Sequence, residues 1–176
     1  MPDYRRLRFP GGYYFFTVVT HKRRCFLTSS LARDKLRHAL VTVNKSRPFK
    51  TVAICLLPDH LHCIWKLPEG DSDFSQRWGS IKSIFSREYR KSIPIPERQA
   101  EKIWQNRFWE RLIRDEDDLS VHIDYTHFNP VKHGYVNNPA EWEFSTIHNY
   151  IKKGYYLSFV ENDGVKPIVD LPSMRE

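Results

Sequence analysis

Two histidines that flank a single leucine are the first side chains in this chain whose types and spacing could do chemistry. His60-Leu61-His62 lies in an apolar run that follows a Pro58-Asp59 turn. Because side chains on a β-strand alternate between its two faces, His60 and His62 should point the same way. Two neutral imidazoles on one strand face form half of a metal site. Two surface histidines on a half-exposed sheet are the alternative, and the pair alone does not separate the two readings.

A second group of polar side chains lies on a predicted helix over residues 115–129, whose first turn is acidic, as the helix dipole favours. At about 100° per residue, His122, Tyr125 and Asn129 fall on one face, apart from the apolar face. Tyr125 and Asn129 are four residues apart and are therefore neighbours. Pro130 should end the helix. A tyrosine packed on the helix end and an asparagine that caps the helix are the structural alternative.

Together the two groups suggest phosphoryl-transfer chemistry. A metal ion held by two imidazoles and one amide oxygen keeps open positions for phosphate oxygens. A free tyrosine has a pKa of about 10, so a phenol nucleophile needs activation. A divalent ion that polarises the phosphate would assist attack by Tyr125. Covalent attack by a tyrosine would conserve the phosphodiester energy for rejoining.

The elements that must position these residues follow the order β-α-β-β-α-β-α. Strands are predicted over residues 13–20, 51–57, 60–67 and 105–113, and helices over residues 30–44, 73–91 and 115–129. This order predicts an α+β fold, a split βαβ sandwich of the ferredoxin-like or RRM-like type. We expect an antiparallel sheet with helices on one face, which leaves the other face free for a ligand. One domain should cover residues 1–150, and residues 151–176 should form a C-terminal tail.

Basic and aromatic side chains point to a nucleic acid. The chain has a formal net charge of +7 and an aromatic fraction of 14%. Residues 1–24 hold six basic side chains against one acidic one, and residues 77–91 hold five against one. Clustered positive charge favours a polyanion, and exposed aromatics stack on the bases of single strands. A soluble protein with solvated lysines and arginines, and with its aromatics in the core, is the alternative.

Several classes of protein are disfavoured. No apolar run approaches the roughly 20 residues of a membrane span, and the N-terminal segment lacks the features of a signal peptide. The three cysteines, Cys25, Cys55 and Cys63, show no CxxC spacing, and the last two lie in apolar runs. Odd, buried thiols suit a reducing compartment, so we expect a cytoplasmic protein, associated with the nucleoid when bound to DNA.

Three segments resemble known transposases. PDHLHCIW is similar to the His-hydrophobic-His (HUH) strand of the single-tyrosine transposases. WQNRFWERLIRDEDDLSVHIDYTHFNPVKHGYV resembles the later signature of the REP-associated tyrosine transposases, with the Tyr-x-x-x-Asn-Pro run at Tyr125, Asn129 and Pro130. YRRLRFPGGYYFFTVVTHKRR resembles the opening of the same branch. The resemblance covers about residues 4–150.

The resemblance implies roles for individual residues. His60 and His62 would be metal ligands, and Asn129 would supply a third, where related insertion-sequence enzymes use glutamine. Tyr125 would attack a scissile phosphate in single-stranded DNA and give a 5′-phosphotyrosine and a free 3′-OH. The ion would be Mg²⁺ or Mn²⁺. His122 shares the Tyr125 face and is an accessory candidate that could contact substrate or metal.

The implied substrate is a repetitive extragenic palindrome (REP), a single-stranded DNA hairpin with a short guide sequence 5′ to its foot. Candidate DNA-binding residues are named by position and charge only: Arg5, Arg6, Arg8, Lys22, Arg23, Arg24, Lys82 and Arg87. The resemblance favours a monomer, although related insertion-sequence transposases are dimers that supply the tyrosine helix in trans. If residues 151–176 lie over the active site as a regulator, deleting them should raise cleavage.

Two other functions compete with this interpretation. A non-catalytic RRM-type module would bind single-stranded nucleic acid through aromatics on the open sheet face, where His60 and His62 stand instead. A replication initiator or relaxase would share the HUH strand, but the tyrosine helix lacks the surrounding pattern of those enzymes, and the chain is short for a relaxase.

Overall fold

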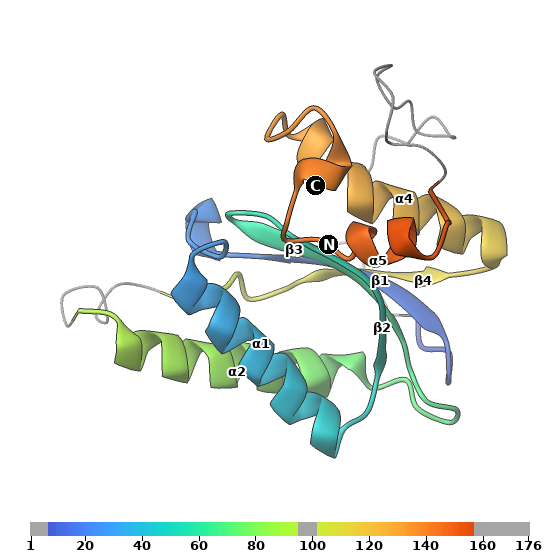
Figure 1. Cartoon of the computed structure of the whole chain (residues 1–176). Coiled ribbons are helices and arrows are strands. Elements are labelled where there is room, and N and C mark those ends of the chain that lie inside the picture. Colours follow the sequence, from blue (N-terminus) through green and yellow to red (C-terminus); the bar gives the residue numbers. More distant parts are fainter. Residues whose placement is uncertain (1–6, 95–101, 157–176) are drawn as a thin grey trace, which may run out of the picture.

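Four antiparallel strands form the centre of the molecule in the computed structural model, which describes residues 7–94 and 102–156 (Figure 1). The strands are β1 (Tyr13–Val19), β2 (Lys50–Leu56), β3 (His60–Lys66) and β4 (Trp109–Ile113). Their order across the sheet is β2-β3-β1-β4, so β1 and β3 are central. The aromatic and β-branched side chains of β1 suit a pleated, buried surface. The α+β fold with split βαβ order is thus confirmed.

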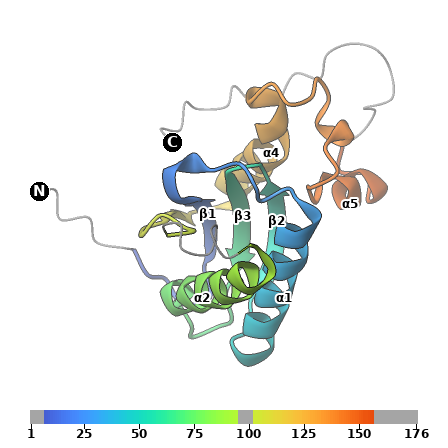
Figure 2. The same cartoon turned by 90° about the vertical axis from the view of Figure 1, so that its left-hand side faces the viewer.

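Two helices, α1 (Ser30–Ser46) and α2 (Phe74–Ser92), cover one face of this sheet (Figures 1 and 2). Each begins at a capping side chain that accepts a hydrogen bond from the first turn, Ser29 for α1 and Asp73 for α2. Between the sheet and the two helices lies the main core, in which the rings of Trp65 and Trp78 stack with centroids 4.4 Å apart. This layer anchors the strand that carries the two histidines.

The opposite face of the sheet is not free, contrary to the expectation from the sequence. Helix α4 (Glu116–Lys132) packs across it, so α4 lies on the far side of the sheet from α1 and α2 (Figure 2). A second, smaller core between α4 and the sheet contains Phe15, Ile64 and Tyr125. Any ligand of β3 on this face must therefore lie between the strand and α4.

Helix α4 also runs further than predicted. Asp115 caps it by accepting a hydrogen bond from the amide of Asp118, but Pro130 lies inside the helix, not after its end. A proline removes one backbone hydrogen bond, which the remaining turn tolerates because His133 N–H closes the helix onto the carbonyl of Asn129 at 3.0 Å. The extra residues put Lys132 on the last helical turn.

The remaining elements flank this framework. Strand β4 is shorter than the predicted 105–113, and a 3₁₀ turn, η1 (His21–Arg23), follows β1. After η2 (Pro139–Glu141), residues 144–146 hydrogen-bond to the outer edge of β2, and α5 (Ile147–Lys152) follows. The domain boundary predicted at residue 150 falls inside α5. Most of the predicted tail, residues 157–176, lies outside the described residues.

Two expectations, one about membrane spans and one about the thiols, can be compared with the structure. No helix within residues 7–94 and 102–156 is long and apolar enough to cross a membrane. Cys55 and Cys63 are buried, as predicted, whereas Cys25 is exposed, and all three are free thiols.

Candidate active site

His60 and His62 lie side by side on the face of β3 that α4 covers. Their ring centroids are 4.9 Å apart, and each side chain is 1% exposed. Leu61 and Cys63 point to the other face, into the core beneath α1 and α2, as the alternation of strand side chains predicts. The strand thus presents two imidazoles together to α4.

Hydrogen bonds at Nδ1 fix both rings. His60 Nδ1 donates to Asp59 Oδ1 at 2.6 Å, and Arg23 Nη1 donates to Asp59 Oδ2 at 3.0 Å. Burial alone would raise the pKa of Asp59, but the hydrogen bonds and charges of His60 and Arg23 outweigh it and lower that pKa. His62 Nδ1 shares a hydrogen bond of 2.9 Å with Thr17 Oγ1 on β1. Such partners orient metal-binding histidines so that Nε2 faces the ion.

Helix α4 turns its polar face, not an apolar one, toward the histidines. Tyr125 is 2% exposed, and its ring centroid lies 5.3 Å from that of His62. Asn129, one turn later, is fully buried. The sequence placed Tyr125 and Asn129 on one face correctly, but this face is the one that packs on the sheet, because the histidines and Phe15 opposite it offer a partly polar surface.

Burial and nearby charge keep His62 neutral. Desolvation, followed by the charges of His60, His133 and Lys132, holds the pKa of His62 well below its usual value. The Asn129 amide lies close enough to oppose this shift, yet neither of its polar atoms makes a hydrogen bond of normal geometry within the described residues. A neutral imidazole is the form that binds a metal ion.

The donor set fits a divalent ion. His62 Nε2 and both polar atoms of the Asn129 amide are buried and have no hydrogen-bond partner in the described part of the chain, whereas buried polar groups are normally paired. No three His, Cys, Asp or Glu side chains among those residues cluster as a metal site. A third protein ligand beside His60 and His62 would therefore be an amide oxygen, which suits Mg²⁺ or Mn²⁺.

The chain is similar to transposases along most of its length. The family model "Transposase IS200 like" matches residues 9–127. The REP-associated tyrosine transposase of Escherichia coli (strain K12) is 44% identical over 156 residues, which cover 89% of this chain and 88% of that protein. The chain belongs to the REP-associated tyrosine transposases. The family resemblance inferred from the sequence motifs is thus confirmed, and with it the assignment as a transposase enzyme.

Two further transposases of this family support the assignment. A putative REP-associated tyrosine transposase of Haemophilus influenzae is 41% identical over 162 residues, with 89% of this chain and 91% of that protein covered. A solved structure of a REP-associated tyrosine transposase bound to a REP hairpin superposes with a TM-score of 0.77 at 40% identity. It covers 96% of this chain and 99% of that one, so the fold is shared over nearly the whole transposase.

The sequence reasoning missed Lys132 and assigned no role to His133, and both lie beside the candidate site residues. Lys132 Nζ donates to Tyr125 Oη at 3.2 Å and lies 5.0 Å from the centroid of the Tyr125 ring. The His133 ring centroid is 5.1 Å from that of His60. The spacing of Tyr125 and Lys132 could have predicted their contact, because residues seven apart lie on one face of a helix. Because Pro130 was expected to end the helix, Lys132 was not considered as a helical residue.

His122 and His127 have different surroundings from the histidine pair. His122 Nδ1 bonds to the carbonyl of Asp118 at 2.6 Å, and burial lowers the pKa of His122. Its ring lies 5.1 Å from that of Phe15, which in turn contacts Tyr125 at 5.7 Å, so its accessory role stays a prediction. His127 instead bonds to Thr146 and Tyr156, and so fastens the C-terminal elements to α4.

The candidate DNA-binding residues lie in different parts of the molecule. Arg5 and Arg6 lie outside the described residues, and Arg8 and Lys22 are exposed. Arg23 reaches the histidine strand through Asp59, as described above. The Arg24 guanidinium instead donates to the carbonyl of Lys102 at 3.0 Å.

Two further candidates lie on α2, on the far side of the sheet from α4. Lys82 Nζ donates to the carbonyl of Gln105 at 2.9 Å, and Arg87 is exposed. Among the described candidates, Arg23 reaches the start of the histidine strand through its ion pair with Asp59, and DNA contacts by any of these eight residues stay predictions.

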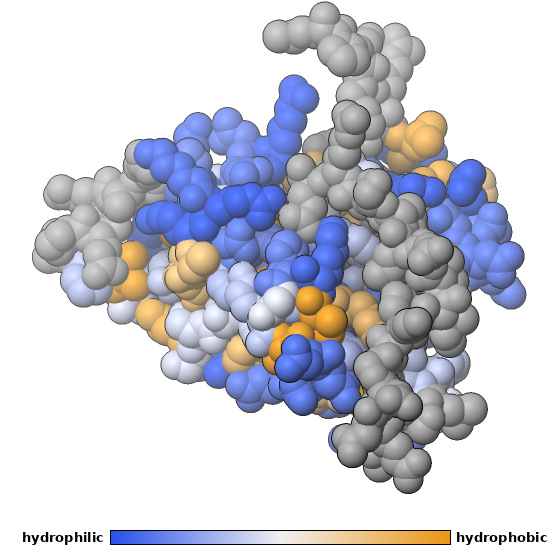
Figure 3. Space-filling model, turned by 90° about the horizontal axis from the view of Figure 1, so that it is seen from above, coloured by the Kyte–Doolittle hydropathy of each residue, from blue (hydrophilic) through white to orange (hydrophobic). Residues whose placement is uncertain are grey.

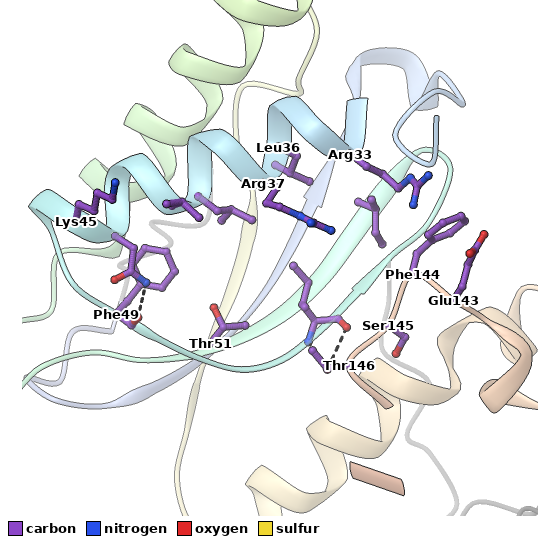
Figure 4. A pocket seen from close by; sticks show the side chains of 15 residues that line it. Arg33, Leu36, Arg37, Lys45, Phe49, Thr51, Glu143, Phe144, Ser145 and Thr146 are labelled. Carbon is purple, nitrogen blue, oxygen red and sulfur yellow. Dashed lines mark hydrogen bonds between the residues drawn. The ribbon is translucent and has the colours of Figure 1, made fainter. Parts of the chain in front are cut away.

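A groove in the described part of the chain lies away from this site. It has a volume of about 660 Å³ and runs between α1, the edge strand β2 and residues 143–146 (Figure 4). Arg33 lies over the ring of Phe144 at one end of it, 4.6 Å from the ring centroid. Neither Tyr125 nor the two histidines line this groove.

The outer surface on the α4 side is mainly hydrophilic. Viewed from above, the residues with defined placement show broad hydrophilic areas with scattered hydrophobic side chains (Figure 3). This face therefore shows no extended apolar patch among the residues drawn in colour.

Proposed function

We propose that the chain cuts and rejoins single-stranded DNA at REP hairpins through a covalent bond to Tyr125. The observation that carries this proposal is the packing of the Tyr125 phenol against His62, beside an Asn129 amide that no described residue satisfies. A relative that is 40% identical is bound to a REP hairpin, which supports the choice of substrate.

Each residue near Tyr125 has a defined task in this proposal. Asp59 and Thr17 orient the two imidazoles, and burial keeps His62 neutral. His60, His62 and Asn129 would hold Mg²⁺ or Mn²⁺, which supplies Lewis-acid polarisation of the scissile phosphate when bound. The enclosing helix and strand exclude water from the phenol, which favours attack by tyrosine over hydrolysis.

The covalent step exchanges one phosphoester for another. Tyr125 Oη forms a bond to the scissile phosphorus, and the bond from phosphorus to the 3′ oxygen breaks. The phenol loses its proton, and the departing 3′ oxygen gains one and becomes a free 3′-OH. The 5′ end remains attached as a phosphotyrosine, so the reverse attack by a 3′-OH rejoins DNA without an energy source.

Substrate access requires a local opening. Tyr125, His60, His62 and Asn129 are each 2% exposed or less. A DNA phosphate can therefore reach them only when the groups that cover them move aside. Closure around the bound strand would then strengthen the electrostatic contacts in the site.

A cleavage assay tests this function. Wild type, incubated with a 5′-labelled or 3′-labelled single-stranded REP hairpin and Mn²⁺, should give a covalent adduct on a denaturing gel and a free 3′-OH fragment. Tyr125→Phe should bind the hairpin equally but give neither product, because only the attacking oxygen is lost. Tyr155→Phe, which changes a tyrosine that is 70% exposed, is the matched control and should cleave normally. Cleavage by Tyr125→Phe would refute the proposal.

The alternative of a non-catalytic RRM-type module has lost its main structural support. Such a module stacks bases on aromatics of an open sheet face, whereas α4 occupies that face here. On β1, Tyr14 and Phe16 point into the opposite core instead.

A further inference from the structure

Lys132 makes two contacts with the same tyrosine. Its ammonium donates to Tyr125 Oη at 3.2 Å and also lies over the face of the ring, 5.0 Å from the centroid. Lys132 is exposed, whereas Tyr125 is buried. The lysine therefore connects the enclosed phenol to the solvent from which a DNA strand arrives.

The position of Lys132 is fixed by the helix. Lys132 follows Tyr125 by seven residues, two turns along α4, and so lies on the same side. The hydrogen bond from His133 N–H to the carbonyl of Asn129 closes this last turn, and a cation there is favoured by the helix dipole. The contact with Tyr125 is thus built into the end of α4, not left to a loop.

The ammonium lies where charge changes during the proposed reaction. The oxygen that it contacts is the one that attacks phosphorus, and non-bridging phosphate oxygens become neighbours of that oxygen once the bond has formed. Lysine serves phosphate as a point charge with three donors, so one ammonium can follow the oxygen from phenol to phosphoester.

We propose that Lys132 is a positioning residue for the nucleophile: it holds the Tyr125 hydroxyl for attack and then pairs with the phosphate attached to that oxygen. This inference rests on the proposed function of Tyr125. The step needs no further reactant, because Lys132 keeps its proton and forms no covalent bond.

The test separates the charge of Lys132 from its packing. Lys132→Met keeps an unbranched apolar chain over the ring but removes the ammonium, and Lys132→Arg keeps a cation. Lys66→Met is the matched control, because Lys66 Nζ lies 5.1 Å from the ring centroid of Tyr13 at the other end of the sheet. Single-turnover adduct formation on a single-stranded REP hairpin with Mn²⁺ is measured beside hairpin binding by the same variants.

Loss of the ammonium should slow the covalent step without weakening binding. Lys132→Met should form the adduct about 10- to 100-fold more slowly, the loss typical of one charge-assisted hydrogen bond. Hairpin affinity should stay within about threefold, because one phosphate contact among many contributes little to it. Lys132→Arg should recover most of the rate, and Lys66→Met should match wild type.

Several outcomes would overturn the inference and leave the proposed function intact. These are adduct formation at the wild-type rate in Lys132→Met, or equal losses in the Arg and Met variants. If Lys132→Met melts below the assay temperature, Lys132→Gln replaces it in the same comparison. Failure of wild type itself to form an adduct would instead refute the proposed function.

Discussion

Asn129 combines complete burial with an amide that no described residue satisfies, and this makes it the residue most informative about the site. An unsatisfied buried polar group lowers stability by about 1–3 kcal/mol. A chain tolerates such a loss where the group serves a ligand, and functional sites are where local rules of packing are broken. Asn129 should therefore lower stability in the absence of a metal ion and raise it in the presence of one.

Replacement of Asn129 by leucine tests whether this residue lowers stability without a metal ion and raises it with one. Asn129→Leu keeps the branched shape and removes both unpaired polar atoms. In EDTA its free energy of unfolding should equal that of wild type or exceed it by about 1–2 kcal/mol. Added Mn²⁺ should stabilise wild type by mass action but not the variant. Urea denaturation with and without Mn²⁺ measures both effects.

An asparagine whose side chain accepts a hydrogen bond provides the control. Asn138 accepts a hydrogen bond from the amide of Ala140 at the start of η2. Asn138→Leu should cost about 1 kcal/mol and leave the response to Mn²⁺ unchanged, because it removes a cap and not a ligand. A large loss of stability for Asn129→Leu in EDTA would show that its amide is paired in solution.

At the scale of elements, an ion pair between a buried arginine and a partly exposed aspartate fixes the helix layer that supports β3. Arg77 on α2 is 2% exposed and donates to both carboxylate oxygens of Asp71, at 2.6 and 3.1 Å. The same guanidinium donates to the backbone carbonyls of Arg47 and Pro48, beyond the end of α1. From the sequence, Arg77 was assigned to the basic segment of residues 77–91. In the structure, the hydrogen bonds of Arg77 instead connect α2 with the end of α1 and with the turn after β3.

This pair should give the stability of the domain a dependence on pH. The hydrogen bond from Arg77 is the main cause that lowers the pKa of Asp71. A lowered pKa in the folded state contributes stability above the unfolded value of about 3.9. That contribution is lost as the pH falls through the folded pKa, because protonation then favours the folded chain less than the unfolded one.

Asp71→Asn should destabilise the protein by about 2 kcal/mol at pH 7. This is less than the loss expected on breaking a fully buried ion pair, because the Asp71 side chain is 33% exposed. The difference from wild type should shrink below pH 4, where the wild-type carboxyl also becomes neutral. Urea denaturation of both proteins at pH 7 and pH 3 measures it. An equal difference at the two pH values would assign the effect to shape and not to charge.

At the scale of the whole molecule, the site is assembled within one chain. His62 on β3 and Tyr125 on α4 belong to the same chain, and their rings lie 5.3 Å apart. The sequence left open whether the tyrosine helix is supplied in cis or in trans. The two rings can meet within a single chain, and supply of the helix in cis stays a prediction. A monomer that is complete in itself stays our prediction for the protein in solution.

Mixed variants can test the arrangement in cis. Tyr125→Phe and His62→Ala should each be inactive, and a mixture of the two should remain inactive, because no single chain then carries both groups. If one subunit supplied the tyrosine helix to the histidine strand of another, some sites in the mixture would carry both groups and cleavage would be restored. The comparison is made over a range of protein concentrations, and the wild-type rate per chain should be constant across it.

The sequence by itself determined the features that arise from local periodicity. Alternation along a strand put His60 and His62 on one face, helical spacing put Tyr125 and Asn129 together, and the order of hydrophobic segments predicted the split βαβ sheet. Each depends on residues within a few positions of one another, so backbone geometry alone decides them. The family motifs carried the same information in recognisable form.

Only the tertiary structure decided how these pieces meet. The Thr17–His62 hydrogen bond joins residues 45 positions apart, and α4 covers a sheet face that was expected to be free. The contact of Lys132 with Tyr125 exists because α4 continues through Pro130, which packing against the sheet stabilises despite the lost hydrogen bond. Such contacts depend on which segments, far apart in the sequence, bury their side chains against one another. No local pattern in the chain determines that choice.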